Sequence, residues 1–252
     1  MAKLTDIVKF LDDYLEIEEI EDGAWNGLQF EGKSEVSKIG FAVDSGLDAF
    51  IQSKERGVDL LIVHHGHFWK NTNPSVKGFS KERLGFLFEN QISLYTAHLP
   101  LDRHKEIGNN AQLLKLLDAK IVGEFDLEEG KNVSWVGELK TPQSAQEIAE
   151  KLNERLNTKC IVLPFGTKQI KTIAVCTGGG GYSVHGKAQE AKVDLYITGD
   201  PIEVYSWDKD AKFNVIFAGH YATETLGVKA LMPVLEKEFG VETIFIDIPT
   251  GL

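Results

Sequence analysis

Apolar runs that end in histidine are the most informative feature of the hydrophobic pattern. Residues 58–67 read VDLLIVHHGH, a continuous apolar run followed by three histidines and a glycine. Residues 92–102 (ISLYTAHLPLD) and 213–224 (FNVIFAGHYATE) follow the same plan. A continuous apolar run, as opposed to an alternating one, is typical of a strand buried on both faces. The pattern therefore predicts three strands with histidines at their carboxyl ends, the first of them buried on both faces.

Apolar residues three and four positions apart predict helices between and around these strands. The first expected helix has Thr5 as its N-cap. Further helices are expected at residues 45–56, 81–90 and 109–117, and another begins at Thr141-Pro142. Pro142 is expected at the first helical position, and Ser144 with Glu147 resembles a capping box. Further strands are expected at 38–44, 133–139, 160–163 and 172–176, and an acidic connection at 118–130.

Two segments of the chain, residues 38–66 and 171–200, resemble each other. In each, a strand and a helix lead to a second strand that begins Val-Asp-Leu, at residues 58–60 and 193–195. A β-α-β unit implies parallel strands and a right-handed crossover. We therefore expect an α/β fold of two similar α/β halves with mixed, mostly parallel sheets, residues 1–125 and 126–252, forming one compact unit. The similarity is short, and chance is the alternative explanation.

Composition narrows the class of protein. The chain has 252 residues, of which 42% are hydrophobic and 26% charged, as in ordinary globular proteins. Its net charge is −11 and it has no Lys/Arg run, which argues against a nucleic-acid partner. No apolar run is long enough to cross a bilayer, and the first residues lack a signal-peptide core. The two cysteines, Cys160 and Cys176, lack metal-type spacing, so we expect free thiols in a cytoplasmic protein.

The histidines point to metal binding. His64 and His65 are adjacent at a strand end, where ligands bind in open α/β sheets. His98 ends the next strand and is followed by Asp102, another candidate. His220 and Glu224 are four residues apart, so on a helix they share one face; the alternative is a solvated polar pair. Imidazole is a common metal ligand, and a nitrogen and oxygen donor set without sulfur suits Zn, Fe, Mn, Co or Ni.

Other positions leave two interpretations open. The glycine run at residues 178–181 follows a strand and is either a tight turn or a phosphate cradle; it matches neither a Walker loop nor a dinucleotide fingerprint. Asp200, at the end of the strand that begins at Val193, either faces the same site or caps the next segment. Trp25 and Asn26 adjoin an Asn-Gly turn signal and serve either packing or the site. The loop at 67–80 either lines a pocket or covers it.

Together these motifs resemble those of the Nif-three-like dinuclear-metal proteins, often labelled GTP cyclohydrolase I type 2. The resemblance rests on VDLLIVHHG, TAHLPLD, CTGGGG, DLYITGD and AGHYATET in this order, and it covers essentially the whole chain. The chain is similar to the short form, which lacks the domain inserted in longer members. One difference is Trp207, which stands roughly where some members have a histidine after the Ile-Thr-Gly-Asp motif.

The resemblance implies two divalent metal ions per chain, bound at a site that the two halves share. By resemblance, His64 and His220 would bind one ion, His65 and Asp102 the other, and Glu224 would bridge them. His98 would line the pocket as a catalytic acid or base. The resemblance also implies a toroidal homohexamer whose sites face an interior cavity.

Three hypotheses about function follow. The first is a metal-dependent hydrolase acting on a small-molecule nucleotide, with GTP as the substrate that the family label implies. The second is a metal-binding scaffold or regulatory protein without turnover. The third is a phosphoesterase that seats a phosphate in the glycine loop at 178–181. The predicted ligands are few enough to leave metal positions open for water and substrate, which favours a hydrolase.

Overall fold

The computed structural model describes residues 1–125 and 133–252 and confirms the α/β fold. The described chain forms two compact units. Unit 1 comprises Met1–Leu101 and Val228–Ile248, and unit 2 comprises Asp102–Gly227 and Pro249–Leu252. These units differ from the halves 1–125 and 126–252 expected from the sequence. Residues 102–125 belong to unit 2, and the chain returns to unit 1 at Val228.

Unit 1 is built on a five-stranded sheet with the order β13-β4-β5-β6-β2. The first four strands of that order run parallel and β2 is antiparallel at the edge. The strands are β2 (Gly27–Phe30), β4 (Lys38–Asp44), β5 (Leu60–His65), β6 (Ser93–Thr96) and β13 (Glu242–Phe245), with a separate ribbon of β1 (Ala2–Lys3) and β3 (Glu35–Val36).

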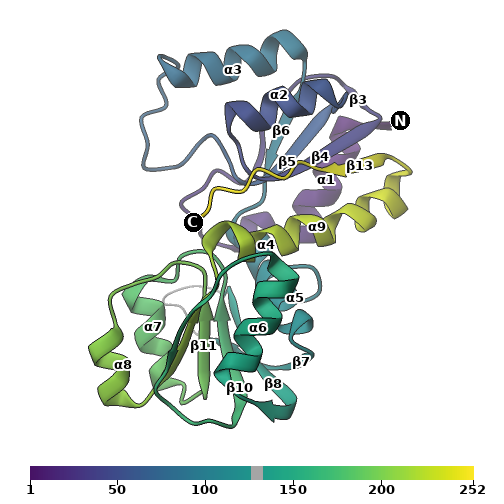
Figure 1. Ribbon diagram of the computed structural model, residues 1–252. Helices are drawn as coiled ribbons and strands as arrows, with labels where there is room; N and C mark the ends of the chain where they lie inside the picture. The colour runs from purple at the N-terminus through teal and green to yellow at the C-terminus, as the bar shows by residue number, and fades with distance from the viewer. Residues whose placement is uncertain (126–132) are drawn as a thin grey trace. The chain divides into compact units, whose positions relative to one another are not determined.

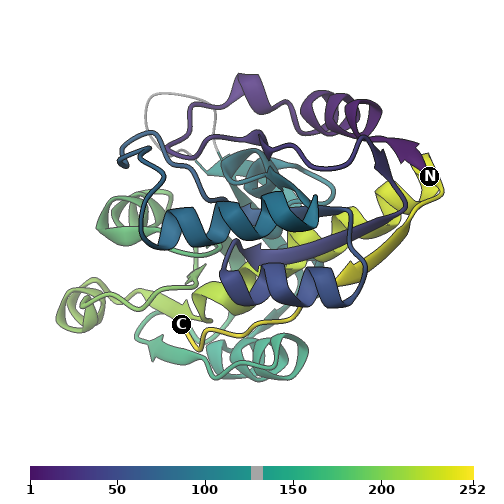
Figure 2. The same cartoon turned by 90° about the horizontal axis from the view of Figure 1, so that it is seen from above.

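Helices cover both faces of the unit 1 sheet (Figures 1 and 2). On one face lie α2 (Leu47–Glu55) and α3 (Phe79–Asn90), whose Phe50 and Leu87 pack with Leu61 and Val63 of β5. On the other face lie α1 (Leu4–Leu15) and the C-terminal part of α9 (His220–Phe239). The β5 strand is consequently buried on both faces, as its continuous apolar run predicted.

Unit 2 is built on a six-stranded sheet with the order β7-β8-β10-β11-β12-β9. Its β10, β11 and β12 are parallel, and the other three pairings are antiparallel. The strands are β7 (Ala119–Phe125), β8 (Ser134–Gln143), β9 (Ile161–Pro164), β10 (Ile170–Cys176), β11 (Leu195–Thr198) and β12 (Asn214–Phe217).

Each face of the unit 2 sheet has its own apolar core. Helices α5 (Asn109–Leu116) and α6 (Ala145–Leu156) pack on one face. Helices α7 (Gly181–Glu190) and α8 (Tyr205–Ala211) pack on the other. Two shorter elements, α4 (Leu99–Arg103) and the 3-10 turn η1 (Ile17–Glu19), complete the described structure.

The internal similarity seen in the sequence has a structural counterpart. In unit 1, β4-α2-β5-α3-β6 has β2 antiparallel to β6, and in unit 2, β10-α7-β11-α8-β12 has β9 antiparallel to β12. The aspartate of each Val-Asp-Leu motif performs the same task. Asp59 accepts hydrogen bonds from the amides of Ser37 and Lys38, and Asp194 accepts them from Lys171 and Thr172. Each aspartate thereby fixes the start of the neighbouring parallel strand.

Several element boundaries differ from the sequence-based expectations. Thr5 is not an N-cap, because α1 begins at Leu4 with Lys3 as its N-cap. Pro142 lies at the end of β8, and the capping box of Ser144 and Glu147 opens α6 without it. The connection expected at 118–130 contains strand β7, and residues 126–130 of it lie outside the described residues. Residue Gly27 begins edge strand β2 where a turn was expected.

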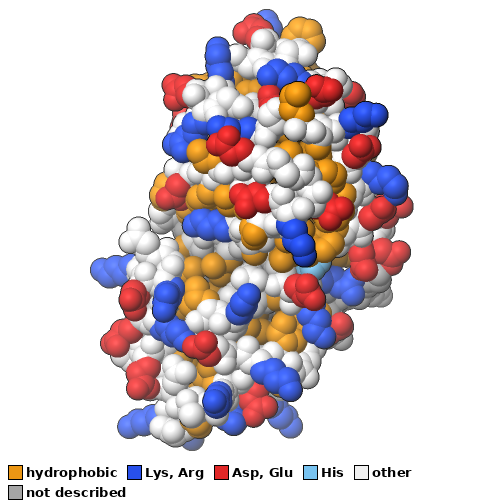
Figure 3. Space-filling view, turned by 90° about the vertical axis from the view of Figure 1, so that its right-hand side faces the viewer, with side chains coloured by type: hydrophobic (Ala, Val, Ile, Leu, Met, Phe, Trp, Pro, Cys, Tyr) orange, Lys and Arg blue, Asp and Glu red, His pale blue; other side chains and the backbone are white. Residues whose placement is uncertain are grey.

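Within the described residues, no helix has the length and apolar character needed to cross a membrane. On the face of the molecule drawn in Figure 3, acidic and basic side chains alternate with small apolar areas. Neither sign of charge forms a continuous patch on that face.

Candidate metal centre

Three histidines meet at one edge of the unit 1 sheet. His64 and His65 are the last two residues of β5, and His98 follows β6 with only Ala97 between. Because β5 and β6 are parallel neighbours, their carboxyl ends lie side by side. The ring centroid of His64 is 4.8 Å from that of His65 and 4.9 Å from that of His98. Ring nitrogens from all three lie within 4.8 Å of one another, close enough to hold a metal ion.

Each of these three rings has its Nδ1 held by an oxygen atom. His64 Nδ1 lies 2.8 Å from the carbonyl oxygen of Ala97, and His65 Nδ1 lies 2.8 Å from Asp44 Oδ1. His98 Nδ1 lies 2.9 Å from Asp22 Oδ1. An oxygen acceptor places the ring proton on Nδ1, which makes Nε2 the nitrogen suited to a metal. Metal-binding histidines are typically oriented in this way.

Asp22 is the best-held of the carboxylates that orient the histidines. It is 5% exposed and accepts hydrogen bonds from the Ala24 amide, the Asn26 side chain and the Leu99 amide. Burial alone would raise the pKa of Asp22, but its hydrogen bond to His98 and those to Ala24 and Asn26 outweigh burial and lower the pKa to about 2. Asp22 is therefore ionised at neutral pH and accepts the Nδ1 proton of His98.

Asn26 contributes to the same arrangement. Its Oδ1 accepts a hydrogen bond from the backbone amide of His98 at 2.8 Å, while its Nδ2 donates to Asp22. Of the two roles left open for Asn26, the structure supports the one at the site. Its neighbour Trp25 is 58% exposed and does not act as a packing anchor.

The loop after β5 brings an aromatic ring to the histidines. The Trp69 ring centroid lies 5.0 Å from that of His98 in an edge-on arrangement. Gln29 of β2 holds this loop, because its Oε1 accepts hydrogen bonds from the amides of His67 and Phe68. A side chain at Gly66 would collide with Gln29, so glycine is required there. The start of the loop expected at 67–80 therefore lines the histidine group.

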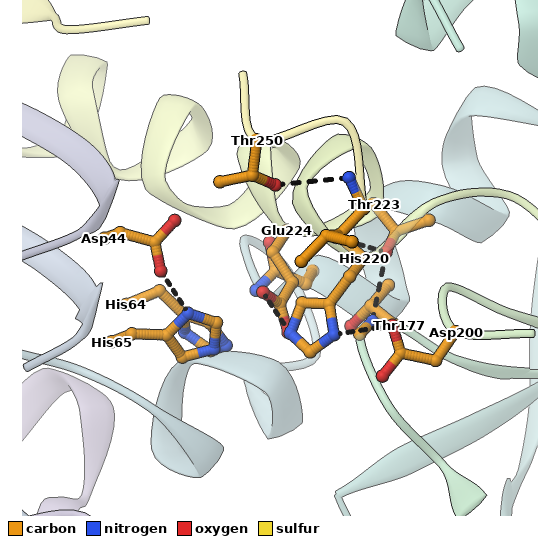
Figure 4. A network of polar contacts seen from close by, with 12 residues as sticks. Asp44, His64, His65, Thr177, Asp200, His220, Thr223, Glu224 and Thr250 are labelled. Carbon is orange, nitrogen blue, oxygen red and sulfur yellow. Dashed lines mark hydrogen bonds and ion pairs between the residues drawn. The ribbon is translucent and has the colours of Figure 1, made fainter. Parts of the chain in front are cut away.

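His220 and Glu224 form the corresponding group in unit 2. They lie in the first two turns of α9, with His220 Nε2 3.1 Å from Glu224 Oε2. Asp200, which follows β11, lies 2.9 Å from His220 Nδ1 (Figure 4). Of the two interpretations of Asp200, the structure supports the one in which it faces the site. The His220 and Glu224 pair is a buried contact and not two solvated side chains, because Glu224 is 3% exposed.

The two carboxylates raise the pKa of His220 to about 9. The hydrogen bond to Glu224 is the largest cause, and Asp200 adds to it against the opposing effect of burial. In the absence of a metal, His220 is therefore protonated at neutral pH. A metal ion bound at His220 would have to displace that proton, so its affinity would rise with pH.

Asp102 lies in α4 and is 5% exposed. Its Oδ1 accepts a hydrogen bond from Asn109 Nδ2 at 2.8 Å and one from Thr177 Oγ1 at 3.3 Å. These contacts fix the position of the Asp102 carboxylate within unit 2.

The glycine run brings its backbone against the His220 and Glu224 pair. Gly178 has a φ of +64°, and a side chain there would overlap the Glu224 carboxylate and lie 3.2 Å from His220 Nε2. The Gly178 amide donates to Thr223 Oγ1 and its carbonyl accepts from the Gly199 amide. These bonds support the tight turn over the phosphate cradle, because the Gly178 amide already has an acceptor.

The remaining histidines are held differently. His185 contacts Asp208 through Nε2 at 2.8 Å, and His67 contacts Ser80 through Nε2 at 2.9 Å. His104 Nδ1 accepts from backbone amides of its own loop. Only the four histidines at the strand ends, His64, His65, His98 and His220, have Nδ1 on an oxygen atom among the described contacts. Trp207 is 69% exposed on α8.

Comparison with known proteins decides the family. The family model for Duf34/NIF3 (NGG1p interacting factor 3) matches residues 2–251. The chain belongs to the Duf34/NIF3 family. This NIF3 protein is 47% identical to the "GTP cyclohydrolase 1 type 2 homolog" of Pyrococcus horikoshii and 45% identical to that of Pyrococcus abyssi, over 98% of both chains in each case. The predicted resemblance is thus confirmed, including the short form.

Solved structures agree with that assignment. The NIF3 protein superimposes on the crystal structure of TTHA1606 from Thermus thermophilus with a TM-score of 0.91 and 38% sequence identity over the whole of both chains. The structure of the NIF3 chain contains groups of His and Glu that could bind metal, as expected. The division of the predicted ligands between two ions stays a prediction.

Proposed function

We propose that this protein is a metal-dependent hydrolase that binds two divalent ions and acts on a nucleotide. The proposed ligands are those implied by the family resemblance, namely His64, His65, Asp102, His220 and Glu224. The observation that carries the proposal is the orientation of the histidines. Each proposed histidine ligand has Nδ1 on an oxygen atom of Ala97, Asp44 or Asp200, as metal-binding histidines typically do.

The donor set fits a divalent ion that accepts both imidazole and carboxylate, and it suits Zn, Fe, Mn, Co or Ni. Bound divalent ions would supply Lewis-acid polarisation of the bond that is hydrolysed. The donors come from the end of β5, from α4 and from the first two turns of α9. Such positions hold ligands more accurately than loops do.

His98 would transfer protons. The ionised Asp22 keeps the proton of His98 on Nδ1, so Nε2 can accept a proton from the attacking water or return one to the leaving group. The Asp22 contact at Nδ1 and the neighbouring Trp69 ring limit how far the imidazole can rotate, and Asn26 holds the His98 backbone. This is the arrangement of an acid–base group that an acidic partner orients.

The nucleotide substrate rests on the names of the relatives. The curated relatives carry the name "GTP cyclohydrolase 1 type 2 homolog", and GTP is therefore the first substrate to test. A phosphoesterase receives less support, because the contacts of Gly178 account for that loop as a turn. A scaffold without turnover is the remaining alternative, and the activity test separates it from a hydrolase.

The first experiment is elemental analysis of the purified protein after loading with each candidate ion. We expect about two ions per chain in the wild type and a sharp fall in Glu224→Ala. Glu238→Ala is the matched control, because Glu238 is an exposed carboxylate on the same helix. Little metal in the wild type after loading would contradict the proposal that the protein binds two divalent ions.

The second experiment measures GTP consumption by the metal-loaded protein, with loss of the guanine absorbance as the signal. We expect turnover in the wild type and loss of about two to four orders of magnitude in His98→Gln. Metal content should stay close to wild type in that variant. Metal binding without GTP consumption under any ion would remove GTP as substrate, and inactivity across nucleotides and phosphoesters would favour the scaffold.

The homohexamer remains part of the proposal, and it is independent of the metal. Light scattering on the purified chain at several concentrations would give its mass. A monomer or dimer at all concentrations would contradict the toroidal assembly that the family resemblance implies.

A further inference from the structure

A buried asparagine joins one proposed metal ligand to the helix that carries two others. Asn109 is the first residue of α5, and none of its surface is exposed. Its Nδ2 donates to Asp102 Oδ1 at 2.8 Å, and its Oδ1 accepts from the backbone amide of Gly227 at 2.6 Å. All of these residues belong to unit 2.

The orientation of the Asn109 amide follows from its partners. The Gly227 amide can only donate, so the Asn109 atom facing it is the oxygen. The nitrogen therefore faces Asp102, whose carboxylate must accept. This position needs a short side chain that offers one donor and one acceptor. Asparagine supplies both, with Nδ2 donating to Asp102 and Oδ1 accepting from Gly227.

Gly227, the residue of α9 that Asn109 contacts, lies on the face of the helix that carries the proposed metal ligands. His220, Glu224 and Gly227 are separated by four and three residues, so they share one face of the helix. The Asn109 side chain therefore bridges Asp102 and that face of α9. Thr177 adds a second bond to Asp102 Oδ1, and Asn110 Oδ1 accepts from the Thr177 amide at 2.8 Å.

The glycine at 227 supports this interpretation. A Cβ there would lie 2.7 Å from Asn109 Oδ1 and 3.0 Å from Asn109 Cγ. Glycine in the middle of a helix is unfavourable compared with alanine. The close approach of Asn109 gives a reason for glycine at this helical position, because any larger residue would push the amide away.

We propose that Asn109 is a positioning residue that fixes the Asp102 carboxylate relative to the face of α9 bearing His220 and Glu224. The inference rests on the proposed function, since it takes these three residues as metal ligands. Asn109 itself would not bind the metal. It acts by holding Asp102 and α9 at one spacing, so that the ligands need no rearrangement when an ion binds.

The test compares two glycine-to-alanine substitutions in helices of unit 2. Gly227→Ala displaces the Asn109 amide, whereas Gly186→Ala in α7 places its methyl group in open space. Helix propensity improves in both, so a loss of metal affinity confined to the folded Gly227→Ala protein would come from the displaced Asn109 amide. The measurement is the Co²⁺ and Zn²⁺ affinity of each protein in competition with a chromophoric chelator, with the melting temperature of the metal-free protein as a check of folding.

We expect Gly227→Ala to lose on the order of 10- to 100-fold in metal affinity, and Gly186→Ala to keep the wild-type value. Asn109→Leu, which has a similar volume and no hydrogen-bonding group, should lose at least as much. Wild-type affinity in folded Gly227→Ala and Asn109→Leu would overturn the inference. Absence of metal binding in the wild type would instead overturn the proposed function, so the two failures are distinguishable.

Discussion

At the scale of single residues, the contact made by Nδ1 distinguishes the four histidines of the candidate site from the other histidines. His64, His65, His98 and His220 each have Nδ1 on an oxygen atom, whereas His185 and His67 are bound through Nε2. The sequence predicted the four histidines from their places at strand ends. It did not predict Asp22 or Asp44 as partners, because hydrogen bonds between distant segments leave no periodic signal.

Asp44 offers a direct test of this orientation. Its Oδ1 lies 2.8 Å from His65 Nδ1, and its side chain is 45% exposed, so it has little part in the core. We expect Asp44→Asn to weaken metal binding by roughly 10- to 100-fold with little loss of stability. Isothermal titration with Zn²⁺ would measure the affinity, with the exposed Asp48→Asn on α2 as control. Equal losses in both variants would point to a general charge effect.

Asp59 should make stability depend on pH. Burial alone would raise the pKa of Asp59, but hydrogen bonds from Lys33 Nζ and the amides of Ser37 and Lys38 lower it below the ordinary value. Because the folded-state pKa is depressed, the stabilisation is complete above the unfolded-state pKa of about 4 and is lost as pH falls through the folded-state pKa.

The substitution Asp59→Asn isolates this contribution. We expect it to cost about 1–3 kcal/mol in the free energy of unfolding at pH 7, with a smaller difference from wild type at pH 3. Urea unfolding at both pH values provides the measurement. A difference that grew on acidification would show that the assigned sign is wrong.

At the scale of elements, the sequence predicted the buried central strands well and the edge strands poorly. Continuous apolar runs indicated β5, β6 and β12, and helical spacing indicated α2, α3 and α5. The edge strand β9 was predicted, but β2, β7 and β13 at the other sheet edges were missed, because they lack a continuous apolar run. In addition, β2 begins with a glycine that resembles a turn signal. Their pairing is set by the sheet they join.

The start of α6 shows a local signal that was interpreted correctly. Ser144 Oγ accepts from the Glu147 amide at 3.2 Å, and Glu147 Oε2 accepts from the Ser144 amide at 2.7 Å. We expect Ser144→Ala to cost about 1 kcal/mol, which for a chain of this length lowers the melting temperature by roughly 2–4 °C. Differential scanning calorimetry would detect it. Metal affinity should not change, and a large loss of affinity would be inconsistent with a cap that acts only on α6.

At the scale of the whole molecule, the short sequence similarity between residues 38–66 and 171–200 corresponds to a repeated supersecondary unit. The repeat was visible because the Val-Asp-Leu motif recurs, and in each unit its aspartate accepts hydrogen bonds from the backbone amides at the start of the neighbouring strand. Its extension to β2 and β9 was not visible, because those strands share no motif. The boundary between units was also not predictable from composition, since helices α4 and α9 cross it without any linker.

Neither unit is a continuous piece of chain, and this has a consequence during synthesis on the ribosome. The N-terminal 101 residues lack β13, which pairs in parallel with β4 as the edge strand of their sheet. Until residues 242–245 emerge, β4 has an unpaired edge. Its apolar residues Ile39 and Phe41, which are fully buried in the folded protein, lie in this strand. The nascent chain therefore exposes an unpaired strand edge until β13 has left the exit tunnel, and a chaperone that shields such edges would be useful until then.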